Sequence, residues 1–280
     1  MPNSRPVYRF NAALVREPSR SVVRGLRAVD HGDPDYDGVA AEHAAYVDAL
    51  EAAGLAVSVL PPLEAFPDSV FVEDLALVFS AGAIVLRPGN AARRGETAQL
   101  APVLRRRFET VLDMSGTGYA DGGDILVTPD HVLIGLSART NAAGAGALGA
   151  CLTKLGYRYK VVTTPSGVLH FKTDCALIEE NCVLSTARLA ASGVFDGLET
   201  LITPEGEEAA ANALRINDVV LVGAQFPRTI EMLDQAGYEV VPLATGEIGK
   251  IDAGLSCMSL RWFDETLDNQ PPTRKKAPVL

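Results

Sequence analysis

A β-rich unit recurs along this chain at intervals of about 50 residues, and this repeat restricts the folds that the chain can adopt. In the first three copies, two runs of β-favouring residues are joined by a short turn, and the fourth copy contains a single run. The copies span residues 75–89, 124–140, 175–189 and 218–229. A period of this length is typical of propellers and other closed arrays, in which one unit cannot bury its apolar face alone.

Helix-favouring segments alternate with these copies. They span residues 93–107, 140–156, 205–213 and 226–237. The N-terminal part supplies a fifth unit, because residues 10–18 are strand-like and residues 39–54 are strongly helical and end in a glycine. A last strand, within residues 255–263, can pair back with this unit and close a ring. The pattern predicts an α/β ring with strands around the centre and helices outside.

A doubly wound open sheet is the alternative that the same pattern allows. The chain contains no GxxxxGK[ST] motif, so nothing supports P-loop chemistry. We expect residues 1–267 to form one catalytic domain. Residues 268–280 are Pro-rich and polar and are predicted to be a disordered tail.

The charge balance excludes several classes of partner. The chain has 35 acidic and 25 basic residues, and its formal net charge of −10 disfavours nucleic acid and anionic membranes. A cationic small molecule suits such a protein better. The N-terminus has no long apolar segment and no run reaches the length of a membrane-spanning helix, so we predict a cytoplasmic protein.

Cysteine and histidine spacing indicates neither a metal site nor a disulfide framework. The four cysteines form no CxxC pair, and the four histidines are scattered. At least three of the cysteines are expected to be small buried hydrophobic residues. We therefore predict that no metal ion is bound.

Acidic residues cluster near two strand ends. Asp68, Glu73 and Asp74 lie in FPDSVFVED, and Asp121 and Asp124 lie in YADGGD. Carboxylates bind a guanidinium group with two parallel hydrogen bonds, so these residues could recognise an arginine-like ligand. Alternatively, they are solvated loop acids or helix caps.

Cys257 and His170 both lie in strand-like runs, LSCMSLR and VLHFKTD. Such a pair can act as nucleophile and general acid/base if the fold brings the two together. The alternative is a buried inert thiol and a hydrogen-bonded core histidine.

Six motifs in order resemble those of the dimethylarginine dimethylaminohydrolase family, which belongs to the guanidino-modifying (pentein) superfamily. They are FPDSVFVED, RPGNAARRGE, DGGDILV, GLSARTN, LHFKT and KIDAGLSCMSLR. The resemblance covers about residues 10–263. It implies a five-bladed α/β propeller and hydrolysis of an N-omega-methylated arginine to citrulline and an amine. It also implies that no cofactor takes part and that the partner is a small guanidino compound.

By position in these motifs, Cys257 resembles the family's nucleophile and His170 its general acid/base. Asp121 occupies the position of the acid that orients the histidine, where many bacterial relatives carry the longer Glu. Covalent attack by sulfur suits a guanidinium carbon, which is a poor electrophile because its charge is delocalised.

The resemblance also implies a set of substrate-binding residues. Asp74, with Glu73 and Asp68 nearby, resembles the group that binds the guanidinium and the substrate backbone. Arg93 and Arg139 resemble the pair that binds the substrate carboxylate.

Two of these assignments have alternatives. Arg94 could replace its neighbour Arg93 as the carboxylate clamp. Leu26 lies in a segment, residues 20–38, that resembles a substrate-covering lid and is punctuated by glycine and proline. Alternatively, this segment is an ordinary loop and Leu26 packs on the core.

Three other functions stay open at this point. An arginine deiminase would use the same chemistry on unmethylated arginine, but such enzymes usually carry an inserted helical domain that this chain lacks. An amidinotransferase would transfer the intermediate to an amine instead of water. A binding protein of the same fold would need neither Cys257 nor His170. The sequence leaves the oligomeric state open, with a homodimer as one alternative.

Overall fold

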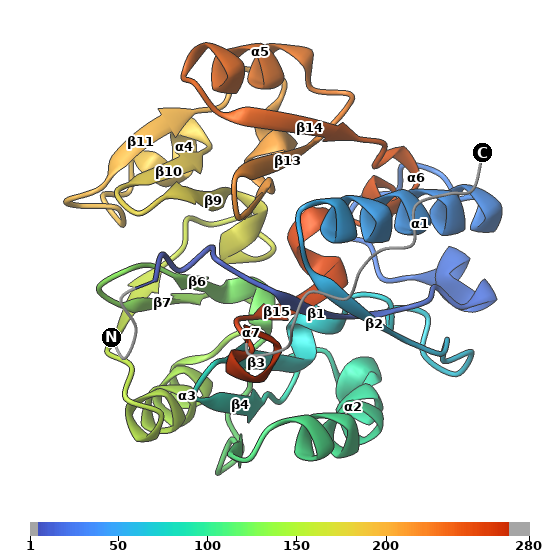
Figure 1. The fold of residues 1–280 in the computed structure, drawn as a ribbon, viewed down its shortest axis with the longest axis vertical. Helices are drawn as coiled ribbons and strands as arrows, with labels where there is room; N and C mark the ends of the chain where they lie inside the picture. Colours follow the sequence, from blue (N-terminus) through green and yellow to red (C-terminus); the bar gives the residue numbers. More distant parts are fainter. Residues whose placement is uncertain (1–4, 269–280) are drawn as a thin grey trace.

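Five three-stranded sheets are arranged in a ring around a common axis (Figure 1). The computed structural model of the protein describes residues 5–268. In every sheet the first strand pairs antiparallel with the second, and the second pairs parallel with the third. This repeated topology confirms the predicted five-bladed α/β propeller and excludes the open sheet.

The strands have equivalent positions in the five sheets. The first strands are β15 (Ser259–Trp262), β3 (Ala76–Phe79), β6 (Ile125–Val127), β9 (Cys175–Glu179) and β12 (Leu214–Ile216). The second strands are β1 (Ala12–Arg16), β4 (Gly82–Val85), β7 (Val132–Leu136), β10 (Cys182–Ser185) and β13 (Val219–Gly223). The third strands are β2 (Ala56–Leu60), β5 (Val111–Asp113), β8 (Tyr159–Thr163), β11 (Glu199–Ile202) and β14 (Glu239–Leu243).

A helix connects the second strand of each sheet to its parallel third strand and lies at the periphery (Figure 1). These connecting helices are α1 (Tyr36–Ala52), α2 (Arg94–Arg107), α3 (Ala142–Lys154), α4 (Ala187–Ala190) and α5 (Pro227–Gln235). Two short helices, α6 (Gly246–Gly249) and α7 (Glu265–Asp268), lie outside this pattern. Parallel strands require such a crossover, which explains why helices and β-rich runs alternate along the sequence.

A short 3-10 turn lies directly or within a few residues before the first strand of each sheet. The turns are η2 (Val72–Leu75), η4 (Gly122–Asp124), η5 (Phe171–Thr173), η6 (Glu208–Ala211) and η7 (Leu255–Met258). Two further turns, η1 (Arg20–Arg24) and η3 (Ala91–Arg93), lie in loops. Because the five sheets have equivalent positions in the ring, their five turns also lie at equivalent positions beside the ring axis.

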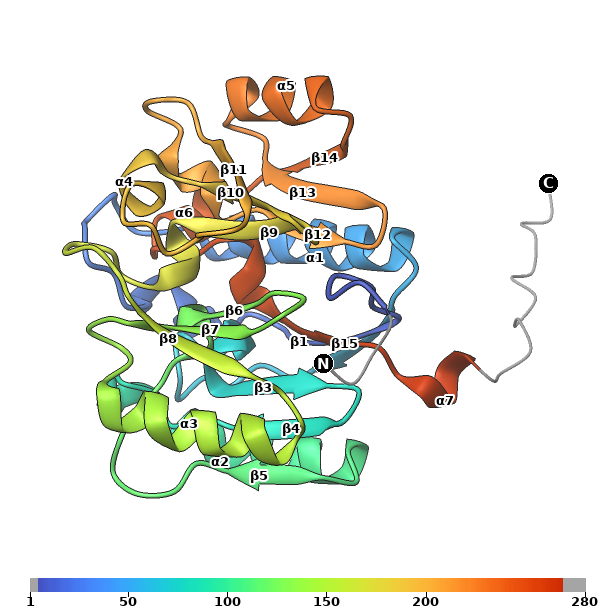
Figure 2. The ribbon, with the colours of Figure 1, turned by 90° about the vertical axis from the view of Figure 1, so that its left-hand side faces the viewer.

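The ring closes through its first and last strands, as the sequence predicted. β15 pairs antiparallel with β1, with Leu14 opposite Leu260. The buried hydroxyls of Tyr46 in α1 and Ser259 in β15 lie 2.5 Å apart. α7 then leads away from one face of the ring (Figure 2), where Glu265 forms an ion pair with Arg5.

The hydrophobic core is divided into five clusters, and each cluster joins two neighbouring sheets. The cluster around Leu14, Leu75 and Trp262, for example, joins the sheet of β1 to that of β3. The second strands are buried almost throughout, because helices or neighbouring sheets cover both of their faces. This two-sided burial explains their continuous apolar runs.

Two secondary-structure predictions were wrong in the fourth and fifth sheets. Residues 205–213, predicted as a helix, contain only the 3-10 turn η6, and β12 follows at residue 214. The connecting helix of the fourth sheet is α4, four residues long, which lies where the sequence indicated the end of a hairpin. The third strands were also missed, since their side chains are partly exposed and show no clear apolar pattern.

Other expectations concern burial and the chain end. All four thiols are free, and Cys151, Cys175 and Cys182 are buried, as predicted. No helix between residues 5 and 268 is long and apolar enough to cross a membrane. The predicted tail lies outside the described residues except for Asp268, which ends α7.

Candidate active site

Four of the five 3-10 turns bring the predicted catalytic residues to one end of the ring axis. Asp74 lies in η2, Asp121 and His170 directly precede η4 and η5, and Cys257 lies in η7. Asp74, His170 and Cys257 line the same small cavity, while Asp121 is fully buried behind His170. The ring therefore brings residues from the N-terminal third and from the C-terminal end of the chain, such as Asp74 and Cys257, to one cavity.

Asp121 holds His170 in place. One carboxylate oxygen of Asp121 lies 3.1 Å from Nε2 of His170, and the other accepts a 2.6 Å hydrogen bond from the backbone N–H of Gly89. The backbone N–H of Asp121 is in turn bound by the hydroxyl of Thr140. The shorter Asp therefore reaches the histidine that it is predicted to orient.

Asp124 has a structural role beside this pair. It accepts hydrogen bonds from the hydroxyls of Ser137 and Thr140 and from the backbone N–H of Phe171. These contacts fix the turn that follows His170. Asp124 is therefore a fully buried, hydrogen-bonded residue, and the alternative of a solvated loop acid does not apply to it.

Two glycines of the DGGD motif allow the close packing of this site. A Cβ atom on Gly122 would lie 1.9 Å from the carbonyl oxygen of Glu73. A Cβ atom on Gly123 would lie 2.8 Å from the ring of His170 and 3.0 Å from the carboxylate of Asp74. The N–H of Gly123 instead donates a 2.9 Å hydrogen bond to Asp74.

Charge and burial set the protonation of the two reactive groups. Burial lowers the pKa of His170, but Asp74, the hydrogen bond to Asp121 and the charge of Asp124 outweigh it and raise that pKa to about 9. Burial, together with the charges of Glu73 and Asp74, raises the pKa of Cys257 to about 11. At neutral pH the cavity therefore contains an imidazolium and a neutral thiol.

The cavity carries a fixed negative charge at Asp74. Burial raises the pKa of Asp74, but His170, Arg93 and the N–H of Gly123 outweigh burial and lower it overall. The carboxylate is therefore ionised at neutral pH. A cationic group bound beside it would be stabilised, and its positive charge would favour ionisation of the nearby thiol.

Asn212 is a site residue that the sequence reasoning missed. It directly follows η6, the fifth turn of the ring, and its side-chain N–H group lies 3.9 Å from Sγ of Cys257. Its side-chain oxygen accepts a hydrogen bond of 3.3 Å from the backbone N–H of Ser256. An asparagine in AANALRI matches no catalytic motif, and only the fivefold recurrence of the turns could have indicated it.

Comparisons with known proteins agree with this geometry. The family model described as N,N dimethylarginine dimethylhydrolase, eukaryotic, matches residues 33–189. The N(G),N(G)-dimethylarginine dimethylaminohydrolase of Pseudomonas aeruginosa is 41% identical over 254 residues, which cover 90% of this chain and all of that protein. This chain belongs to the dimethylarginine dimethylaminohydrolase family.

Solved structures of this family superimpose closely on the ring. A cysteine-to-serine mutant of the Pseudomonas aeruginosa enzyme, complexed with citrulline, is 40% identical with a TM-score of 0.88, over 91% of this chain and all of that one. A histidine-to-glycine mutant of dimethylarginine dimethylaminohydrolase, as an adduct with S-methyl-L-thiocitrulline, is 41% identical. Its TM-score is 0.86, and the match covers 90% of this chain and 99% of that one.

Not all of the substrate-binding residues that the resemblance to the dimethylarginine dimethylaminohydrolase family implies line the cavity. Leu26, Asp68, Asp74, Arg93 and Arg139 line the cavity. Glu73 does not line it. Glu73 and Asp74 lie in the same tight turn, but Asp74 points to the site and Glu73 points to the opposite side. There Glu73 contacts Lys172, Ser256 and Arg261.

The two arginines of the predicted carboxylate clamp differ in burial. Arg93 is almost completely buried, and its guanidinium contacts Asp74 at 2.5 Å and Glu96 at 2.8 Å. Arg139 is more exposed, and its guanidinium lies 3.8 Å from Asp121. Arg94, the alternative to Arg93, donates a hydrogen bond of 3.5 Å to the backbone oxygen of Pro88 and does not line the cavity.

Leu26 lines the cavity and belongs to the segment that the sequence predicts to be a lid. Its backbone N–H donates a 2.8 Å hydrogen bond to Asp68, and the next residues contact Asp252 through the N–H of Ala28. The cavity has a volume of about 40 Å³, which is too small for an amino acid. The lid predicted for residues 20–38 stays a prediction.

Asp74, Asp121 and His170 also place ligand atoms within 4.8 Å of one another, a set that could hold a metal ion. The contacts described above give all three residues another role, since Asp121 orients His170 and Asp74 carries the negative charge. The absence of a metal ion and of other cofactors stays a prediction.

Proposed function

We propose that this protein hydrolyses N-omega-methylated arginine, as asymmetric dimethylarginine or monomethylarginine, to citrulline and dimethylamine or methylamine. The observation that carries the proposal is that Cys257, His170 and the carboxylate of Asp74 line one cavity in a chain of this family. A nucleophile, an acid and an anionic anchor are the three groups that displacement of an amine from a guanidinium needs.

Substrate binding prepares the nucleophile. The substrate guanidinium pairs with Asp74, whose charge otherwise raises the pKa of Cys257. The bound cation thus neutralises an anion beside the thiol and adds a positive charge of its own. The thiol loses its proton more easily in the complex than in the free enzyme.

The first chemical step forms a covalent intermediate. The Cys257 thiolate adds to the central carbon of the guanidinium and forms a C–S bond. The C–N bond to the methylated nitrogen then breaks, and His170, an imidazolium at neutral pH, gives its proton to the leaving amine. A thiouronium group remains on Cys257, and His170 is neutral.

The second step uses the same histidine as a base. Neutral His170 takes a proton from a water molecule, whose oxygen adds to the thiouronium carbon. The C–S bond breaks, the thiolate leaves, and the second proton of the added water passes to solvent, so that the ureido group of citrulline is formed. Asp121, 3.1 Å from Nε2, stabilises the imidazolium whenever it forms and keeps the ring oriented.

The remaining expectations belong to the same proposal. The substrate carboxylate binds Arg139 with Arg93 behind it, and Asp68 and Leu26 contact the amino-acid end. The cytoplasm suits a protein with four free thiols, because thiols stay reduced there. The possible homodimer stays a prediction that size-exclusion chromatography can decide.

Substitution of the nucleophile tests the mechanism. Cys257→Ser is expected to abolish turnover while the fold and the thermal stability are retained, because a hydroxyl is a far weaker nucleophile than a thiolate. Acid quenching of the wild type during turnover should give a peptide around Cys257 that carries the substrate minus its methylated amine. A Cys151→Ser variant is the matched control and should keep full activity. Citrulline formation by Cys257→Ser at the wild-type rate would contradict the mechanism.

A further inference from the structure

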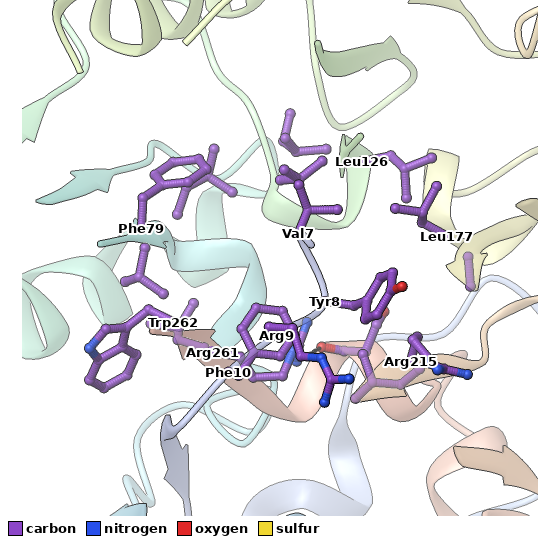
Figure 3. Close-up of a pocket in the computed structure, with 18 of the residues that line it drawn as sticks. Val7, Tyr8, Arg9, Phe10, Phe79, Leu126, Leu177, Arg215, Arg261 and Trp262 are labelled. Carbon is purple, nitrogen blue, oxygen red and sulfur yellow. Dashed lines mark hydrogen bonds between the residues drawn. The ribbon is translucent and has the colours of Figure 1, made fainter. Parts of the chain in front are cut away.

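A second cavity lies on the ring axis, on the opposite side of the turns from the active site. Its volume is about 450 Å³, within the range of small-molecule sites. The first strands of the sheets and the N-terminal segment Arg5–Phe10 form its walls (Figure 3). The cavities share no lining residue.

Apolar side chains line most of this axial cavity. Figure 3 shows them around a central space, and they come from the N-terminal segment and from all five of the first strands. They include Val7, Phe10, Phe79, Leu126, Leu177 and Trp262. An apolar or aromatic body would be shielded from water here.

The charged groups of the axial cavity are mainly cationic, although the chain as a whole is acidic. Five basic residues, Arg5, Arg9, Lys172, Arg215 and Arg261, and two acidic residues, Glu73 and Glu180, line it. Arg5 and Arg9 form exposed ion pairs with Glu265 and Asp218. The other three cations therefore decide what the cavity can bind.

Arg215 is held by two aromatic rings and by one backbone oxygen. Its guanidinium carbon lies 5.1 Å from the ring centre of Tyr8 and 5.6 Å from that of Tyr238, and its Nε donates a 2.9 Å hydrogen bond to the backbone oxygen of Asn217. Within residues 5–268, its two terminal nitrogens make no hydrogen bond or ion pair. A planar, preorganised guanidinium with free terminal N–H groups recognises carboxylates and other oxyanions.

The inner end of the cavity has more cations than anions. Lys172 and Arg261 both contact Oε1 of Glu73, so one carboxylate serves two cations. Nε of Arg261 is buried without a hydrogen-bond partner within the described residues. These groups leave a net positive charge beneath the apolar walls.

We propose that the axial cavity binds a small organic anion with an apolar body, whose anionic group pairs with Arg215. The apolar walls supply binding energy, and the preorganised guanidinium selects for negative charge. A guanidinium compound would meet Arg215, Lys172 and Arg261 and be repelled, so this is not a second substrate site. The site is separate from the catalytic cavity, and the inference does not depend on the proposed activity.

Two dyes of matched shape test the proposal on the full-length protein. 1-Anilinonaphthalene-8-sulfonate is an aromatic anion, and N-phenyl-1-naphthylamine is the same aromatic body without the charge. We expect the anionic dye to bind with one equivalent per chain, to raise the melting temperature and to bind about tenfold or more tightly than the neutral dye. Saturating citrulline should not displace it.

Two variants locate the binding site. Arg215→Gln removes the charge and should weaken binding of the anionic dye about tenfold, with little effect on the neutral dye. Leu177→Phe fills space in the cavity and should weaken binding of both dyes. Arg105→Gln, which removes an exposed arginine on α2 outside the cavity, is the control and should change neither.

Several results would overturn the proposal. They are equal affinities for the two dyes, displacement by citrulline, no effect of Arg215→Gln, and binding of several equivalents with a lowered melting temperature, as a partly unfolded chain would show. The melting temperature of each variant alone separates loss of the site from loss of the fold.

Discussion

The pKa values of His170 and Cys257 decide in which protonation state the active site meets its substrate. With pKa values of about 9 and about 11, the free enzyme at neutral pH holds a protonated histidine and a neutral thiol. The reactive state needs the imidazolium together with the thiolate. That state is a small fraction of the free enzyme, and the apparent pKa values belong to the pair as a whole.

The pH dependence of kcat/KM follows from the order of these two pKa values, with that of His170 below that of Cys257. Between pH 6 and about 9 the fraction with thiolate and imidazolium grows about tenfold per pH unit, because one proton must leave Cys257 while His170 keeps its own. Above about pH 9, His170 also loses its proton, and the fraction of enzyme with thiolate and imidazolium no longer rises with pH. Steady-state kinetics over pH 6 to 10 would measure this rise. A kcat/KM that is level from pH 6 to 9 would show that the ion pair already exists in the free enzyme.

Asn212 gives a second prediction at this scale. Its side-chain N–H group stabilises a negative charge on the sulfur 3.9 Å away, while its oxygen binds the backbone N–H of Ser256. Asn212→Asp keeps the oxygen but replaces the donor with a charged acceptor. We expect it to raise the pKa of Cys257 and to lower kcat/KM about tenfold or more at neutral pH.

The pH dependence of thiol alkylation by iodoacetamide measures that pKa directly. Asn181→Asp adds the same charge at an exposed position and is the control. If Asn212→Asp lowers only the melting temperature and leaves the thiol pKa and kcat/KM unchanged, Asn212 has a purely structural role.

At the scale of elements, the segment around Leu26 and the 3-10 turns show what sequence reasoning can and cannot provide. Most of the helices and hairpins could be predicted because burial leaves a clear apolar pattern in them, but the short helix α4 and the turn η6 could not. The direction in which the Glu73 side chain points could not be predicted. Neighbouring residues of a 3-10 turn point in different directions, and no periodicity of the sequence indicates which one faces the site. Asn212 was missed for a related reason, because its role depends on the place of its turn in the ring and not on its neighbours in sequence.

The predicted lid, residues 20–38, gives a prediction about how the substrate reaches the active site. Leu26 lines a cavity of about 40 Å³, while residues 28–33 of the same segment are exposed. Leu26→Gly should raise KM several-fold or slow turnover, with little loss of thermal stability, because the covering contact is lost while the core is unchanged. Val29→Gly, at an exposed position in the same segment, is the control.

Limited proteolysis checks the same movement. Trypsin cleavage after Arg27 should slow when citrulline is added, while cleavage after the exposed Arg158 is unaffected. A large drop in melting temperature for Leu26→Gly with unchanged kinetics, together with ligand-independent cleavage, would show that Leu26 is a core residue and that the segment is not a lid.

At the scale of the whole molecule, the closed ring explains why residues so far apart in sequence act together. The repeat period and the last strand predicted the ring, and the pairing of β1 with β15 confirms it. The ring brings five equivalent turns to the axis, where one side forms the catalytic cavity and the other the axial cavity. The order of the catalytic residues could be taken from the motifs, but their contacts depend on this closure.

The central claim is that the site releases a methylated amine from a methylated arginine and leaves citrulline. The most direct measurement supplies the purified protein with asymmetric dimethylarginine, monomethylarginine and unmodified arginine side by side, and quantifies citrulline and the released amine. We expect citrulline and an equal amount of dimethylamine or methylamine from the two methylated substrates, with a higher kcat/KM than for arginine. Citrulline from arginine alone would identify an arginine deiminase, and no citrulline from any of the three would contradict the proposed function.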